Sequence, residues 1–268
     1  MDWGGSLEIK FPFAPESTKN RGRFRKAVHN VIQSEGVDFL LTGEVHVRWA
    51  LFLDEEQRRR TDRYADCDNY VKTLNDAIKG PEGILIDDTQ VQSLSVSWID
   101  TRETEYFELV IESRIDDSLR KPLALYELAD DLYYPATDEF AGHLIPLAEQ
   151  TILRAVHVVN KIEAAGSPGD RRRWDILRMA LPNLTGFHKS RVIDSGFPLY
   201  GRHEWESLFA AEIDQCKQWA ADLGHPWFAP GPEGGLDQRP SRVLPRQDQV
   251  SKLREQTEVE GFPANDLL

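Results

Sequence analysis

Aspartates gather in two short segments of the sequence whose residue types could hold a metal ion. The first segment is Asp66–Asn69, followed by Lys72 and Asp76, and the second is Asp87–Gln90. Carboxylates held close together repel one another, and a bound divalent cation relieves that repulsion. A set of oxygen ligands without His or Cys suits a hard ion, so we expect Mg²⁺, with Mn²⁺ as an alternative. Such an ion lowers the pKa of bound water and neutralises a phosphate oxygen, which is the chemistry of phosphodiester hydrolysis.

The first segment is expected to present two carboxylates on one side of the chain. If residues 64–68 are extended, their side chains alternate, so Asp66 and Asp68 point the same way. Cys67 then points to the other side, where it would be a small buried filler. An extended backbone would therefore let Asp66 and Asp68 contribute to one site.

A helix and an apolar run are expected to supply the remaining polar residues. Residues 69–79 have apolar residues at helical spacing, which puts Lys72 and Asp76 one turn apart on one face. The apolar run 84–86 then carries Asp87–Asp88 to the edge of a neighbouring strand. Lys72 would supply a point charge for the scissile phosphate or the leaving oxygen.

Hydrophobic periodicity predicts mixed structure in the first part of the chain and helices after it. Alternating apolar residues predict strands over 7–11, 44–51, 91–98 and 106–112. Helical spacing predicts helices over 23–35, 69–79, 138–164, 170–181 and 203–223. We therefore expect an α+β fold, a small mixed sheet with packed helices, followed by a mainly α-helical C-terminal extension.

The change of character along the chain predicts three parts. Residues 1–120 contain both acidic segments and would form the α+β domain. Residues 121–225 would form the helical extension, whose role the sequence does not indicate. Residues 226–268 are rich in Pro and Gly, so we expect a mobile tail, with a short terminal helix as an option.

Composition limits the classes of function. The chain has 268 residues, a formal net charge of −13 and two cysteines, Cys67 and Cys216. Two distant cysteines are no disulfide framework, which favours the reducing cytoplasm. No segment approaches the roughly 20 apolar residues of a membrane span, and the start lacks a signal-peptide pattern, so we expect no membrane partner. The acidic charge argues against nucleic-acid binding unless cations cluster locally, as they do in Lys19–Lys26 and Arg58–Arg63.

The segments DCDNYVKTLNDAI and LIDDTQVQSL, with the spacing between them, resemble the RusA family of Holliday-junction resolvases. The resemblance covers roughly residues 5–115. It implies that Asp66, Asp68 and Asp88 bind the metal and act in catalysis, and that Lys72 is the required lysine. Asp87 would adjoin the metal as a further ligand. The supporting positions would be Asn69, Asp76 and Gln90.

The resemblance also implies a substrate and an assembly. Members are small homodimeric α+β domains that cut branched, four-way DNA with Mg²⁺, so we expect junction DNA as partner and a homodimer. The cationic residues expected to contact DNA backbone are Arg21, Arg23, Arg25, Lys26, Arg58, Arg59, Arg60 and Arg63.

Three features depart from the family pattern. Trp98 stands where members often place a lysine, the net charge is acidic, and the segment 121–268 has no counterpart in the minimal domain. These departures leave an alternative open: a catalytically weak DNA-structure-binding or regulatory protein that keeps the fold. A magnesium-dependent endonuclease of branched DNA is the function that the sequence favours.

Overall fold

The computed structural model of the chain combines mixed sheets with helices, which confirms the predicted α+β class. It describes residues 5–16, 21–56, 67–114, 116–129, 131–164 and 185–229. The predicted helix over 170–181 and the predicted tail, except for its first residues 226–229, lie outside the described residues. Among the helices that are described, none has the length and apolar character needed to cross a membrane.

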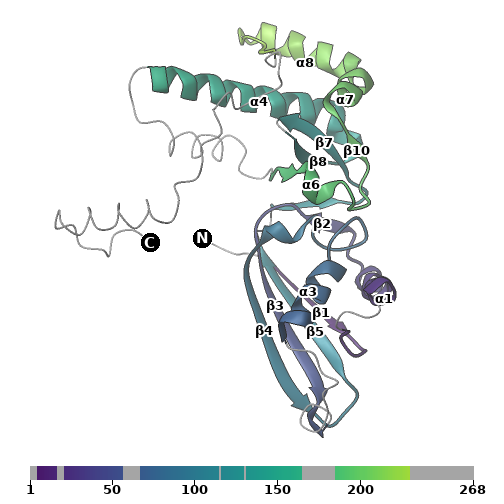
Figure 1. Cartoon of the computed structure of the whole chain (residues 1–268). Helices are drawn as coiled ribbons and strands as arrows, with labels where there is room; N and C mark the ends of the chain where they lie inside the picture. The colour runs from purple at the N-terminus through teal and green to yellow at the C-terminus, as the bar shows by residue number, and fades with distance from the viewer. Residues whose placement is uncertain are drawn as a thin grey trace, which may run out of the picture.

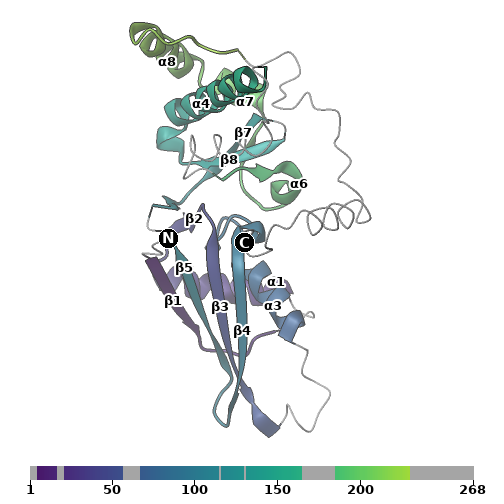
Figure 2. The same ribbon diagram turned by 90° about the vertical axis from the view of Figure 1, so that its left-hand side faces the viewer.

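The first half of the chain forms a four-stranded sheet (Figures 1 and 2). Its strands lie in the order β1 (Gly5–Phe11), β5 (Tyr106–Ser113), β3 (Val45–Asp54) and β4 (Val91–Thr101). Only the β3–β4 pair is parallel. Every second residue of β3 is buried, which confirms the alternation expected for this strand.

Two helices cover one face of this sheet: α1 (Arg21–Ser34) and α3 (Cys67–Ala77) (Figure 1). Both present apolar residues at helical spacing to the core. The buried residues of the two helices include Phe24, Val28, Ile32, Tyr70 and Leu74. The indole nitrogen of Trp49 on β3 donates to the Asn75 side chain of α3 over 3.0 Å, which fixes the helix against the central strand.

The extension contains a second, smaller sheet as well as helices. Its strands lie in the order β10 (Leu199–Tyr200), β7 (Ala124–Ala129), β8 (Leu132–Ala136) and β9 (Phe187–His188). The helices of this part are α4 (Asp138–Ala164), α6 (Lys189–Val192), α7 (Arg202–Leu208) and α8 (Ala210–Asp222). Helix α4 has the bounds that the sequence predicts.

Strands β7 and β8 were not predicted from the sequence. Residues 124–129 read ALYELA, and Ala, Leu and Glu suit helices as well as buried strands. The two strands pair in an antiparallel hairpin in which Asp131 has a φ of 61°. Aspartate visits this left-handed region more readily than most residues, so the turn is compatible with the sequence. Tertiary pairing therefore decides the structure here, and local propensity does not.

The predicted single helix over 203–223 is divided into α7 and α8 at Phe209. Phe209 has φ −107° and ψ 25°, outside helical values, and its side chain is buried. Among the other apolar residues of the predicted helix, Trp205 and Cys216 are also buried, whereas Leu208 and Trp219 are exposed. With the helix divided at Phe209, only some of these apolar residues reach the core.

A hydrophobic cluster joins the extension to the first half of the chain. Leu40 on β2 (Phe39–Leu41), which pairs with β6 (Ser118–Arg120), is fully buried in this cluster, and so is Ile86. Their apolar neighbours from the extension are Leu123, Leu125, Tyr133, Phe187, Val192 and Phe197. The division near residue 120 stays a prediction, but the two parts share this core.

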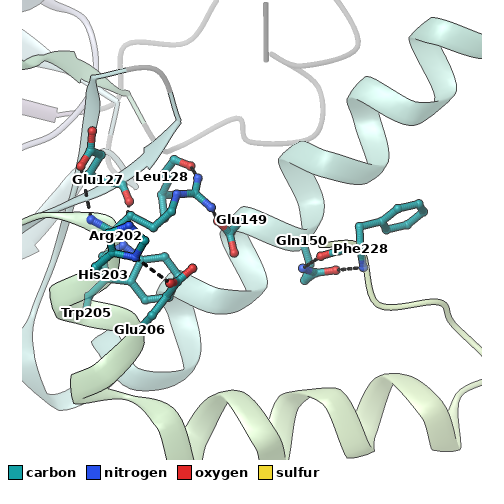
Figure 3. Close-up of polar contacts among 9 residues, drawn as sticks. All are labelled: Glu127, Leu128, Glu149, Gln150, Arg202, His203, Trp205, Glu206 and Phe228. Carbon is teal, nitrogen blue, oxygen red and sulfur yellow. Dashed lines mark hydrogen bonds and ion pairs between the residues drawn. The ribbon is translucent and has the colours of Figure 1, made fainter. Parts of the chain in front are cut away.

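A buried ion pair ties α7 to α4 and β7 (Figure 3). The guanidinium of Arg202 contacts the carboxylate of Glu149 and the carbonyl of Leu128. Trp205 donates its indole N–H to the Glu127 carbonyl over 2.7 Å. Burial raises the pKa of Glu149 more than the charge of Arg202 lowers it, so this carboxylate depends strongly on its partner.

Replacing Arg202 by Ala should therefore destabilise the extension. The substitution leaves the Glu149 carboxylate buried without its cation, which typically costs about 3–5 kcal/mol. Urea unfolding measures the change. The control is Lys217→Ala, which removes an exposed ion pair with Asp214 and should alter stability by less than about 1 kcal/mol. If both substitutions had a similarly small effect, the stabilising role of the buried Arg202–Glu149 ion pair would be contradicted.

Candidate active site

The second acidic segment forms a tight, internally bonded turn. Residues Asp88–Gln90 make one turn of 3-10 helix, η1, that leads into β4. Asp87 is the N-cap: its carboxylate accepts from the Thr89 N–H over 3.1 Å, and the Gln90 side chain accepts from the Asp87 N–H over 3.1 Å. This reciprocal capping box fixes the backbone on both sides of Asp88.

Gln90 anchors this turn to the core. Its side chain is buried and uses both ends of the amide. The oxygen accepts from the N–H groups of Ile86 and Asp87, and the nitrogen donates to the carbonyls of Leu41 and Gly43 at 2.8 and 3.0 Å. The amide thus joins the acidic turn to the end of β2, and each of its four bonds satisfies a backbone group.

The two aspartates of this segment have different environments. Asp87 is 3% exposed, and its carboxylate is used as a cap. The Asp88 side chain is 37% exposed and faces cationic groups. A half-exposed carboxylate on a rigid turn fits a hard cation, since it can exchange its ion pairs for a metal. The arrangement favours Asp88 as a ligand, Asp87 caps the turn, and the role of Asp87 as a further ligand stays a prediction.

The first acidic segment begins a helix. Because α3 begins at Cys67, Asp68 lies in a helical first turn, and the expected extended backbone through residue 68 is wrong. An acidic residue in the first turn is stabilised by the helix dipole, which explains the earlier start. Cys67 is half-buried. Asp66 lies outside the described residues.

Helix α3 presents its polar residues on the surface. Asp68, Asn69 and Lys72 are exposed, and Lys72 is one turn from both Asp68 and Asp76 along the helix. Lys72 is therefore on the helix in the place that the sequence predicts, with its side chain accessible to a ligand.

Lys79 connects the two acidic segments. Its ammonium is 2.9 Å from the Asp76 carboxylate and 3.6 Å from that of Asp88. Burial alone would lower the pKa of Lys79, but the hydrogen bond to Asp76 and the charges of Asp88, Asp76 and Asp87 outweigh it and raise the pKa. Lys79 was not among the predicted site residues; its place three residues after Asp76 was the available signal.

The predicted DNA-contacting residues of α1 have different roles in the fold. Arg23 and Lys26 are exposed. Arg21 reaches the Asp76 carboxylate at 3.9 Å, so it lies beside the acidic network. Arg25 donates to the Lys79 carbonyl over 2.8 Å and thereby secures the end of α3. Arg58, Arg59, Arg60 and Arg63 lie outside the described residues.

Trp98 packs beside α3. It is half-buried on β4, and its ring meets that of Tyr70 edge to face, with centroids 6.1 Å apart. Members of the resembling family often have a lysine at this position. Here Trp98 instead makes an aromatic contact with the helix that carries Asp68 and Lys72.

The described residues contain no group of three or more His, Cys, Asp or Glu side chains that could hold a metal ion. The predicted set of Asp66, Asp68 and Asp88 is not tested by this result, because Asp66 is outside those residues. The three-aspartate metal site therefore stays a prediction. The donors that are described, Asp68 and Asp88, are accessible carboxylates of the kind that Mg²⁺ prefers.

Residues 13–112 match the model of the family described as endodeoxyribonuclease RusA. This range contains α1, α3 and η1, together with the central strand β3. The N-terminal region is therefore RusA-like, as the sequence resemblance predicted, and the matched family is one of endodeoxyribonucleases that resolve Holliday junctions. A search of curated proteins gives no match to the chain.

Replacing Gln90 by Met should destabilise the fold by about 3 kcal/mol. Methionine fills a similar volume but leaves two buried N–H groups and two carbonyls without the amide, at about 1–3 kcal/mol for each group left unpaired before relaxation. Urea unfolding gives the value. Gln218→Met is the control, because Gln218 is exposed and its amide donates to the nearby Asp222 side chain. A loss below about 1 kcal/mol for Gln90→Met would refute the anchoring role.

Proposed function

We propose that the chain is a magnesium-dependent endodeoxyribonuclease that cuts branched DNA, in the manner of a Holliday-junction resolvase. The observation that carries the proposal is Asp88: a rigidly held, half-exposed carboxylate between cations, inside the region that matches endodeoxyribonuclease RusA. The substrate would be DNA with a four-way or similar branch, and the reaction would be hydrolysis of a phosphodiester bond.

The residues that would hold Mg²⁺, or Mn²⁺, are Asp66, Asp68 and Asp88. When bound, the ion would supply activation of water and neutralisation of charge on the scissile phosphate. Asp87 would hold Asp88 in place through the capping box. Asn69 and Asp76 would support the arrangement from α3, and Gln90 from the core.

Cations of the site would hold the phosphate. Lys72 is exposed on α3 and can approach a DNA phosphate as a point charge. The hydrogen bond to Asp76 and the neighbouring carboxylates raise the pKa of Lys79, which favours its charged ammonium form. Arg21, Arg23 and Lys26 add exposed cations on α1, so local charge would favour DNA despite the net charge of −13.

The family resemblance further supports a homodimer, in which two-fold symmetry would place two sites across one junction. We also infer a cytoplasmic location from the absence of a disulfide framework in the sequence. The division into a nuclease domain over 1–120, an extension over 121–225 and a tail over 226–268 is part of the same proposal.

The second candidate is a DNA-structure-binding or regulatory protein with weak catalysis. It is favoured by Trp98, which occupies part of the surface beside α3, and by the ion pairs that engage Asp88. Both candidates would bind branched DNA, but the second would cut it weakly or not at all. A cleavage assay therefore distinguishes them.

We expect the protein to cut a synthetic four-way junction with Mg²⁺ and to lose that activity in Asp88→Asn. Loss of a metal ligand removes several kcal/mol of stabilisation of the transition state, so the rate should fall at least about 100-fold. Binding to the junction should persist, since the substitution removes a negative charge. Gel analysis of end-labelled junctions measures cutting, and a mobility-shift assay measures binding.

The matched control is Asp214→Asn, an exposed aspartate on α8 that should leave both measurements unchanged. Junction binding without cutting by the unaltered protein would favour the second candidate. Equal cutting by Asp88→Asn and the unaltered protein would reject the role of Asp88.

A further inference from the structure

Arg191, which belongs to the extension, lies at the candidate active site. Its guanidinium is 4.0 Å from the Asp88 carboxylate, on the opposite oxygen from Lys79. Arg191 follows β9 on the short helix α6, far along the chain from both acidic segments. The contact therefore depends on how the extension packs against the first half.

The packing that holds α6 in place is extensive. Val192, next to Arg191, is fully buried in the cluster that also contains Ile86 and Leu40. Since Ile86 precedes Asp88 by two residues, this shared cluster connects α6 to the acidic turn. Figures 1 and 2 place α6 on the side of the second sheet that faces β2.

Both ends of α6 are also secured. At its start, the Lys189 N–H donates to the Asp131 carbonyl over 2.7 Å, and its ammonium pairs with the Asp131 carboxylate. Beyond its end, the chain packs on the turn that follows Lys79. A Cβ added to Gly80 would lie 3.2 Å from the Ser195 carbonyl. The extension thus contacts the segments that carry Lys79 and Asp88.

The Arg191–Asp88 pair contributes little to stability. The side chains are 57% and 37% exposed, and an exposed pair at this distance is worth about 0–1 kcal/mol. The hydrophobic cluster is sufficient to hold α6. A guanidinium kept accessible on a fixed support, beside a carboxylate proposed to bind metal, is better suited to contact a ligand.

We propose that Arg191 is a phosphate-binding residue of the nuclease site, so that the extension forms part of the surface that receives the DNA backbone. This inference rests on the proposed function. A planar guanidinium pairs with two phosphate oxygens, whereas Lys79 on the other side of Asp88 acts as a point charge. The phosphate adjoining the metal would meet Lys79 from the first half and Arg191 from the extension.

The test compares Arg191→Ala and Arg191→Lys with the unaltered full chain. The protein is mixed with a synthetic four-way junction in the presence of Ca²⁺ in place of Mg²⁺. Ca²⁺ then occupies the same carboxylates while the protein binds the DNA. Affinity is measured across a series of salt concentrations. Loss of one phosphate contact should weaken binding about 5- to 20-fold and reduce the slope of log affinity against log salt by about one.

Arg191→Lys should recover the salt slope, because it keeps the charge, and only part of the affinity, because it lacks the planar fork. Lys217→Ala, which removes an exposed cation on α8, is the control and should match the unaltered chain. Thermal unfolding should show similar stability for all variants, in line with the small energy of an exposed pair.

An unchanged salt slope in Arg191→Ala, with the unaltered chain binding and cutting junctions, would overturn this inference and leave the proposed nuclease in place. Tighter binding of Mn²⁺ by Arg191→Ala with unchanged DNA affinity would likewise overturn it, since Arg191 would then only compete with metal for Asp88. Absence of junction binding by the unaltered chain would reject the proposed function itself.

Discussion

The side-chain amide of Gln90 is the interaction on which the candidate site depends. It makes two hydrogen bonds to the backbone before Asp88 and two to the backbone at the end of β2. Buried peptide groups without a partner are costly, so these bonds stabilise the observed arrangement of the turn. Asp87 completes that arrangement as the cap, and Asp88 is left as the accessible carboxylate.

The same turn is the meeting point of the two halves. Ile86 lies in the cluster shared with the extension, and Gln90 bonds to the backbone at the end of β2, so buried residues hold the chain on both sides of Asp88. Lys79 and Arg191 then approach Asp88 from separate parts of the chain. A site composed in this way is accessible at its centre and rigid around it, which suits a reaction that needs fixed charges around a phosphate.

The residues that could be predicted from the sequence are those whose role depends on local spacing. Alternation in β3, the bounds of α4 and the place of Lys72 on a helix follow from periods that are visible in the chain. The acidic segments were recognisable because their spacing resembles a known family. The start of α3 was misplaced by two residues because helix ends are set at a scale that periodicity does not resolve.

The rest depends on contacts between distant segments. Nothing in the sequence around Arg191 indicates that it faces Asp88, because the contact depends on a hydrophobic cluster that brings Val192 and Ile86 together from distant parts of the chain. Strand β7 has residues that suit helices as well as strands, and its pairing with β8 makes it part of a sheet. The most direct measurement of the central claim is anomalous diffraction from a crystal soaked in Mn²⁺. We expect a manganese peak about 2.0–2.4 Å from carboxylate oxygens of Asp88, Asp68 and Asp66. A crystal without such a peak at saturating Mn²⁺, with Asp88 still paired to Lys79 and Arg191, would contradict the account.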